Sequence, residues 1–303
     1  MASLLDMTDV PMKNILENCG FKSVLTLRKV CHSLRNFVDA SCFKTDLKDI
    51  ELTLGPNGFS VICRSADFSS TNGLGLAKDW TPNDLKIILK MAQNTKLTLF
   101  YVKTIQDNVG GLDDLEDILK NQTHPLQTKR FRMEGSEILK VLPYLDSKTL
   151  KGILIFRAYY ENGDQSAKGI EKVIELEQFK NAVVLHIADC FLVRADLRKF
   201  FHFQWIRVKL LETSLEELVA LKEAFVTSTH MQFFYLGGIN LNENQLEQVF
   251  GAPFNDDGYR RSEWFFKNHN CKEHVLRIEW FSSRITFWKW EANKVPQDAV
   301  VQH

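Results

Sequence analysis

The sequence predicts a mixed α/β protein in which a short all-helical segment precedes a curved β/α solenoid with its helices on one face of the sheet. Residues 7–43 show helical periodicity and no strand signal, whereas β-rich runs alternate with amphipathic helices after Leu47. The run at 130–133 alternates arginine with apolar residues, so one face of the sheet is expected to meet water. Fully covered parallel strands read as continuous apolar runs, which disfavours the alternative of a doubly wound sheet.

The composition is that of an ordinary globular protein, since 45% of the residues are hydrophobic and 25% are charged. Lysine plus arginine and aspartate plus glutamate number 38 each, so no global field draws the chain to nucleic acid or to an anionic membrane. No run approaches the roughly 20 apolar residues of a membrane span, and the start lacks the basic region of a signal peptide. Six cysteines without a C-x-x-C pair indicate reduced thiols. We therefore expect an intracellular protein, cytoplasmic or nuclear, with no membrane partner.

Two apolar stripes run through the helical segment. Pro11 falls in the first turn of the first helix, where a missing amide is harmless, and Gly20 is expected to end that helix. The first stripe comprises Met12, Ile15, Leu16 and Cys19, and the second, after a cap at Ser23, comprises Val24, Leu27, Val30, Cys31 and Leu34. A unit of about 40 residues rarely buries such helices alone, so part of this surface is expected to contact another protein.

The longer region opens with a predicted hairpin, residues 50–54 and 59–63, around the turn Gly55-Pro56-Asn57-Gly58. Further strands are expected around Leu99, Phe131, Ile155, Leu185, Val208 and Phe234, and aromatic strands at 264–266, 276–281 and 285–290. Helices are expected at 85–92, 112–119, 138–145, 170–179, 197–201, 215–225 and 246–250. Intervals of about 20 to 30 residues between strands are typical of leucine-rich repeats, whose sequential strands pair side by side.

No constellation of catalytic residues is found. The chain lacks the P-loop, dinucleotide-binding, serine-hydrolase and zinc-protease motifs. His269, Cys271 and His274 carry ligand-capable side chains, but they have no fourth partner nearby and do not match a zinc spacing, so a loop between strands is the favoured interpretation. The acidic run at 113–117 is expected to favour a helix N-terminus. We therefore predict no enzyme activity, no cofactor and no metal.

The water-exposed sheet face is the candidate binding site. Alternation places basic and aromatic side chains together on it, and arginine and aromatic residues are the commonest hot spots of protein interfaces. Guanidinium groups also recognise carboxylate or phosphate in bidentate fashion. The residues expected to bind a target are Arg130, Arg132, Phe156, His186, Arg207, Lys209, Phe233 and Tyr235. One alternative is an ordinary solvated sheet face, and another places the target on loops or on the terminal aromatic strands around Trp280, Trp288 and Trp290. The basic residues are too few for nucleic acid, which is not expected as a partner.

The clearest motif near the N-terminus is Leu27-Arg28-Lys29-Val30-Cys31, with its spacing back to Ile15-Leu16. With this motif the stretch resembles an F-box. The Leu-Pro pair with which that family begins falls on Met7-Thr8, and the family's later tryptophan is replaced by Leu34.

A second set of motifs lies between about residue 120 and residue 254. It includes Pro125–Lys129, Leu139–Asp146, Leu176–Ala182, Phe200–Phe203 and Phe250–Phe254. This region looks like the FTH module, a domain of unknown function that accompanies F-boxes in a large family of nematode proteins.

Together the resemblances imply a substrate receptor of an SCF-type cullin–RING ubiquitin ligase, with an F-box domain at 1–45 and a leucine-rich-repeat-like domain at 46–303. The F-box would dock on a Skp-type adaptor bound to a cullin scaffold, and the C-terminal domain would hold an unknown protein target. The residues expected to contact the adaptor are Met7, Thr8, Pro11, Ile15, Leu16, Val24, Leu25 and Leu27. One alternative is an interaction module outside any ligase, with its helical stripes fully buried within the chain. Another is an enzyme with an unrecognised site in a deep polar pocket.

Overall fold

The computed structural model describes residues 8–41, 43–55, 58–65, 74–105, 109–135, 137–157, 170–255 and 261–302. The chain divides into two compact units, Met1–Lys151 with Ala158–Gly163, and Gly152–Arg157 with Asp164–His303. In the part of the chain that the structure describes, no helix combines the length and the apolar character that crossing a bilayer requires.

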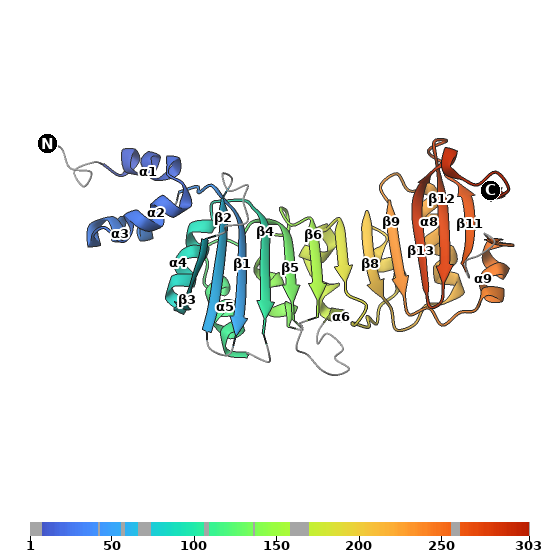
Figure 1. Ribbon diagram of the computed structural model, residues 1–303, viewed down its shortest axis with the longest axis horizontal. Coiled ribbons are helices and arrows are strands. Elements are labelled where there is room, and N and C mark those ends of the chain that lie inside the picture. The colour runs from blue at the N-terminus through green and yellow to red at the C-terminus, as the bar shows by residue number, and fades with distance from the viewer. Residues whose placement is uncertain are drawn as a thin grey trace. The chain divides into compact units, whose positions relative to one another are not determined.

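The first unit begins with a segment of short helices. They are α1 (Asp9–Asn18), α2 (Phe21–Leu27) and α3 (His32–Ala40) (Figure 1). The expected second helix is therefore split in two, and the residues of its apolar stripe are divided between α2 and α3. The break folds α3 back toward α2, and Arg28 Nε holds the two together by donating to Asp39 Oδ1 at 2.6 Å. The side chains buried in this segment are Met12, Leu16, Phe21, Val24, Leu34 and Val38.

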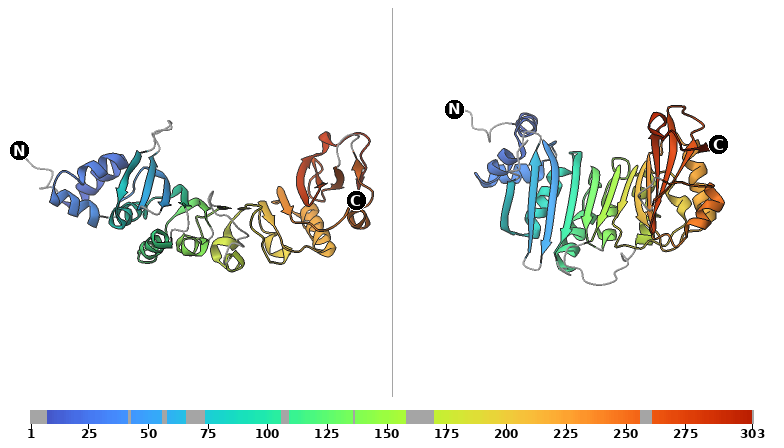
Figure 2. Two further views of the ribbon diagram at one scale, coloured as in Figure 1. Left: turned by 60° about the horizontal axis from the view of Figure 1, so that its bottom comes forward. Right: turned by 45° about the vertical axis from the view of Figure 1, so that its right-hand side comes forward.

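The sheet of the first unit combines a hairpin with parallel strands. Its strands are β1 (Leu47–Gly55), β2 (Gly58–Ser65), β3 (Leu74–Trp80), β4 (Leu97–Thr104) and β5 (Thr128–Glu134), in the spatial order β3-β2-β1-β4-β5. β1 pairs with β2 in an antiparallel hairpin, as the Gly-Pro-Asn-Gly turn predicts, while β1, β4 and β5 run parallel. The helices α4 (Pro82–Ala92) and α5 (Val109–Lys120) lie on one face of this sheet (Figures 1 and 2).

The sheet of the second unit begins with parallel strands in sequence order. These are β6 (Gly152–Phe156), β7 (Val184–Ile187), β8 (Trp205–Lys209) and β9 (Phe233–Gly237). β9 then pairs antiparallel with β13 (Arg284–Glu291), which continues through β12 (His274–Phe281) and β11 (Ser262–Lys267) to β10 (Phe254–Asn255). The last strand, β14 (Val301–Gln302), pairs with β11. The helices are α6 (Ile170–Val173), α7 (Glu177–Asn181), α8 (Leu215–Thr227) and α9 (Glu243–Phe250), with 3-10 turns η4 (Leu197–Phe200) and η5 (Ala292–Lys294).

The expected helix at 138–145 is instead a pair of 3-10 turns, η2 (Ile138–Lys140) and η3 (Leu142–Tyr144). Pro143 explains the difference, because a proline inside an α-helix removes one hydrogen bond and its ring clashes with the preceding turn. The predicted helix at 170–179 is likewise divided into α6 and α7, and Leu176 between them has extended backbone.

Side-chain alternation separates the two faces of each sheet. In the second unit Ile206, Val208, Phe234 and Leu236 are fully buried, as are Leu218 and Leu221 of α8. Arg207, Lys209 and Tyr235, which point the other way, are only half-buried. The mixed α/β class with N-terminal helices is confirmed.

Candidate interaction sites

Several of the residues expected to contact an adaptor lie at the surface of the N-terminal helices. These are Thr8 and Pro11, which are exposed, and Ile15, Leu25 and Leu27, which are half-buried. Met7 lies outside the described residues. Leu16 and Val24 have no exposed surface, because they face the core of the helical segment. They cannot contact a partner while the helices stay together, so their expected contact role is corrected to a structural one.

Two apolar side chains that were not among the expected contacts are more exposed than the expected aliphatic contacts Ile15, Leu25 and Leu27. Val10 and Val30 have exposed fractions of 70% and 66%. Val10 precedes the first stripe, and Val30 leaves the second stripe because the chain turns between α2 and α3. A valine outside the buried stripes of so small a unit is the signal that could have revealed Val10, whereas Val30 belongs to the predicted second stripe and is exposed only because that helix is split.

The buried part of the helical segment is joined to the rest of the first unit by polar contacts. The Phe21 amide donates to Asp46 Oδ1 at 2.7 Å, and the Thr45 amide donates to Thr95 Oγ1 at 2.9 Å. The Lys90 ammonium group, near the end of α4, donates to the Asp39 carbonyl. Part of the helical segment is therefore engaged within the chain, whereas Val10 is exposed and Leu25 is half-buried.

The exposed face of the second unit carries three rows of side chains across β8, β9 and β13. The strand register defines them. The aromatic row is Trp205, Phe233 and Trp288, the polar row is Arg207, Tyr235 and Thr286, and the cationic row is Lys209, Gly237 and Arg284. Neighbouring strands lie about 4.8 Å apart, so the side chains within a row are immediate neighbours.

Aromatic rings contact one another from strand to strand. Trp205 stacks on Phe233 with 4.5 Å between ring centroids, and Trp288 meets Phe233 edge-on at 4.4 Å. On the β6 and β7 side, His186 lies 4.7 Å from Phe156 and 6.2 Å from Trp205. Phe233 is only 8% exposed, so the half-buried indoles on either side provide the accessible surface in its place. Trp288 belongs to the alternative surface on the terminal strands, whereas Trp205 was not among the expected residues.

The one charged side chain of the polar row, Arg207, already has a carboxylate partner in the chain. Arg207 donates to both carboxylate oxygens of Asp189, at 3.3 and 2.7 Å, and the Tyr235 phenol donates to the same carboxylate at 3.2 Å. The guanidinium of Arg207 also lies 4.3 Å above the Tyr235 ring. Burial alone would raise the pKa of Asp189, but the hydrogen bonds and the charge of Arg207 hold it below its usual value. Arg207 was expected to bind an anionic target, and the structure gives it an internal carboxylate instead.

The cationic row borders an open pocket of about 350 Å³. Its lining includes Lys209, Gly237, Gly238, Ser282, Ser283 and Arg284. Neither Lys209 nor Arg284 has an ion-pair partner among the residues that the structure describes. Uncompensated positive charge on this face therefore lies at the pocket, two residues along the strand from the paired Arg207.

Family models match residues 4–46 as an F-box domain and residues 111–254 as an FTH domain. The chain carries an F-box domain followed by an FTH domain. No curated protein and no solved structure gives a significant match. The models name no organism, so the expected nematode origin stays a prediction.

The FTH domain accounts for only part of the exposed face. Lys209 and Tyr235 belong to it, whereas Arg284 and Trp288 come from β13, after the end of the FTH match at residue 254. The pocket is thus formed jointly by the FTH domain and by the hairpin that follows it.

Arg130 and Arg132, also expected to bind a target, lie on β5 in the first unit, whereas the other expected residues lie in the second. Arg130 is exposed. Arg132 donates to Glu134 at 2.6 Å and stands 4.7 Å from the Tyr101 ring. Burial alone would raise the pKa of Glu134, but the hydrogen bonds from Tyr101 and Arg132 hold that pKa below its usual value. The pKa of Tyr101 is raised by burial and by its hydrogen bond to Glu134. Arg132, like Arg207, is engaged by a carboxylate of its own unit.

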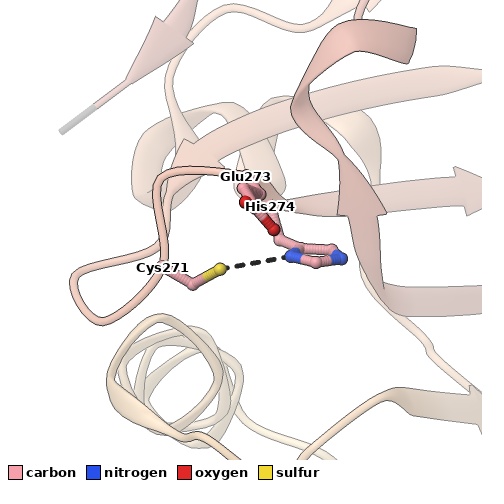
Figure 3. A group of neighbouring side chains, drawn as sticks. All are labelled: Cys271, Glu273 and His274. Atoms are coloured by element: carbon pink, nitrogen blue, oxygen red, sulfur yellow. Dashed lines mark hydrogen bonds between the residues drawn. The ribbon is translucent and has the colours of Figure 1, made fainter.

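One group of ligand-capable side chains gathers in the loop before β12 (Figure 3). Cys271 Sγ lies 3.2 Å from His274 Nδ1, and a carboxylate oxygen of Glu273 is within 4.8 Å of both. His269, which the sequence analysis placed with them, is not part of this group among the residues that the structure describes. A structural zinc site takes four protein ligands, and the described residues of this loop offer three, so we interpret the group as a hydrogen-bonded thiol–imidazole pair in a loop between strands.

Proposed function

We propose that the protein is the substrate-recognition subunit of an SCF-type cullin–RING ubiquitin ligase. The F-box domain supports the docking of a Skp-type adaptor, which would connect the chain to a cullin scaffold. The observation that carries the proposal is the exposed apolar surface of the helical segment, in which Val10 and Val30 are largely exposed and Leu25 and Leu27 are half-buried. Exposed apolar side chains gathered on so small a unit indicate a protein partner.

Such a subunit needs no chemistry of its own. Holding a target near the ligase raises the effective concentration of its lysines at the reacting centre, and this positioning alone accelerates transfer. We therefore assign no catalytic residue and no cofactor, and the setting of the protein would be the cytoplasm or the nucleus.

The exposed face of the second unit is the proposed target-binding surface. We propose that the β/α region from residue 46 onward acts as a leucine-rich-repeat-like domain, whose one-sided sheet leaves this face open. Trp205, Trp288, Tyr235 and Lys209 on it are half-buried. Tryptophan and tyrosine are enriched among interface hot spots, which favours a protein target over solvation alone.

The proposal for the F-box domain can be tested by coexpression with a Skp-type adaptor and copurification. Val10→Asp is the cleanest change, because Val10 is exposed and lies in the first turn of α1, where an acidic residue favours the helix dipole. Each aliphatic side chain buried by a partner contributes roughly 1.5 to 3 kcal/mol, so Val10→Asp and Leu25→Asp should each weaken adaptor binding by about tenfold or more.

Val300→Asp is the matched control, since Val300 is 77% exposed and lies outside the F-box domain. It should copurify with the adaptor as the wild type does. If Val10→Asp and Leu25→Asp also retain the adaptor at equal yield, with thermal unfolding unchanged, the chain is an interaction module outside a ligase.

A further inference from the structure

The pocket beside the cationic row has a glycine between two cationic residues. Gly237 stands between Lys209 and Arg284 in the strand register and contributes no side chain of its own, so the Lys209 side chain can lie over Gly237 and Gly238 on its way into the pocket. Two interstrand spacings place the Cα atoms of Lys209 and Arg284 about 10 Å apart, which both long side chains can bridge onto one small group. The pocket therefore has a cation on each side, from β8 and from β13, and can hold an anion between them.

Other groups at the pocket are arranged to favour an anion. The carboxylate of Asp189 also lines the pocket, but Arg207 neutralises it through two hydrogen bonds. The guanidinium of Arg284 lies 5.0 Å above the ring of Phe281, which is 40% exposed and positions it at the rim. The β12–β13 turn adds the hydroxyls of Ser282 and Ser283, which can donate hydrogen bonds.

We infer that this pocket binds the phosphoryl group of a phosphorylated side chain on a protein target, which deepens the proposed function and rests on it. A phosphoryl group carries about −1.5 to −2 charges near neutral pH, which matches the two uncompensated cations better than a single carboxylate does. Charge-assisted hydrogen bonds from lysine and arginine to phosphate oxygens are among the strong ones. The serine hydroxyls supply further donors.

The rest of the exposed face sets a second requirement on the target. The aromatic row lies four residues from the cationic row along β9, from Phe233 to Gly237, which is about 13 Å of extended chain. An extended target segment places residues four apart on the same side. The target therefore carries a large apolar side chain four residues from the phosphorylated one, seated against Trp205 and Trp288.

The test uses the full chain and a fluorescent peptide library with a central phosphothreonine and random flanks, alongside the same library without phosphate. The phosphorylated library should bind at least tenfold more tightly in fluorescence anisotropy. Peptides selected from it should be enriched in large apolar residues four positions from the phosphothreonine. Equal binding of the two libraries overturns the inference. It is also overturned if inorganic phosphate displaces both libraries equally well.

The pocket itself is tested by substitution. Lys209→Glu and Arg284→Glu should each lose the phosphorylated library by tenfold or more. Gly237→Val crowds Lys209 without reversing a charge, because the backbone of Gly237 is not left-handed and a Cβ there would lie 3.4 Å from Lys209 Cγ, and it should also weaken binding of the phosphorylated library. Lys272→Glu, an exposed lysine in the loop at the other end of β12, is the matched control and should bind normally.

Retention of the phosphorylated library by Lys209→Glu and Arg284→Glu overturns the inference. Adaptor copurification on the same variants separates this failure from failure of the proposed function. The pocket variants should keep the adaptor, and Leu25→Asp, which tests the F-box domain, should still bind the library.

Discussion

Asp189 determines the charge balance of the exposed face, because it neutralises the arginine that the sequence placed at the centre of the binding surface. Its folded pKa lies below the usual value, so its contribution to stability is present above the unfolded pKa of about 3.9 and is lost as the pH falls through the folded pKa. The side chains of Asp189 and Arg207 are 44% and 36% exposed, which limits the contribution of the pair to about 1 kcal/mol.

Asp189→Asn should therefore lower the free energy of unfolding near pH 7 by up to about 1 kcal/mol, and the difference from the wild type should vanish at about pH 2. Urea unfolding at the two pH values measures it. Asp114→Asn, a change at an exposed aspartate of α5, is the control and should leave unfolding near pH 7 unchanged. A difference that persists in acid would mean that packing, and not charge, links Asp189 to Arg207.

Between elements, a buried pair of threonines connects the segment after α3 to the start of β4. The Thr45 amide and hydroxyl both lie 2.9 Å from Thr95 Oγ1, and both residues are buried. Thr95→Val keeps the shape but leaves the Thr45 amide without its acceptor, which costs about 1 to 3 kcal/mol. Thr95→Ser retains the hydroxyl and should stay close to the wild type in thermal unfolding. Unfolding of Thr95→Val at the wild-type temperature would show that the Thr95 hydroxyl contributes no stability.

Elements were predictable where a local pattern determines them. The hairpin turn and the strands centred on Phe131 and Val208 follow from turn composition and from alternation. The predicted helix at 138–145 was wrong, because the prediction followed the apolar periodicity and disregarded Pro143. The split between α2 and α3 could not be read from the stripe, because Val24 of α2 and Leu34 of α3 are both buried and fall in one continuous apolar periodicity.

The candidate site was predictable only in part, for the same reason. Alternation on β8 and β9 identifies which side chains share the exposed face. It does not identify Asp189, which lies in the loop after β7, or Arg284, which reaches Gly237 only through the pairing of β9 with β13. That pairing joins strands separated by the whole β10–β12 region, and no local pattern in the sequence records it.

At the scale of the whole molecule, the proposal requires one chain to hold the adaptor and the target at the same time. Ubiquitin transfer to a bound phosphopeptide by the reconstituted ligase tests this directly. Leu25→Asp should lose transfer because it loses the adaptor, and Lys209→Glu should lose it because it loses the target. Each variant keeps the contact that the other lacks, so an equimolar mixture contains both contacts on separate chains.

The mixture should nevertheless remain inactive, because the gain in effective concentration exists only when both contacts belong to one tether. A chain with both substitutions gives the baseline, and the wild type diluted with that chain gives the activity expected for half the sites. Transfer by the mixture at the level of the diluted wild type would show that the two functions need not share a chain. The covalent connection between the F-box domain and the exposed face would then have no role in transfer.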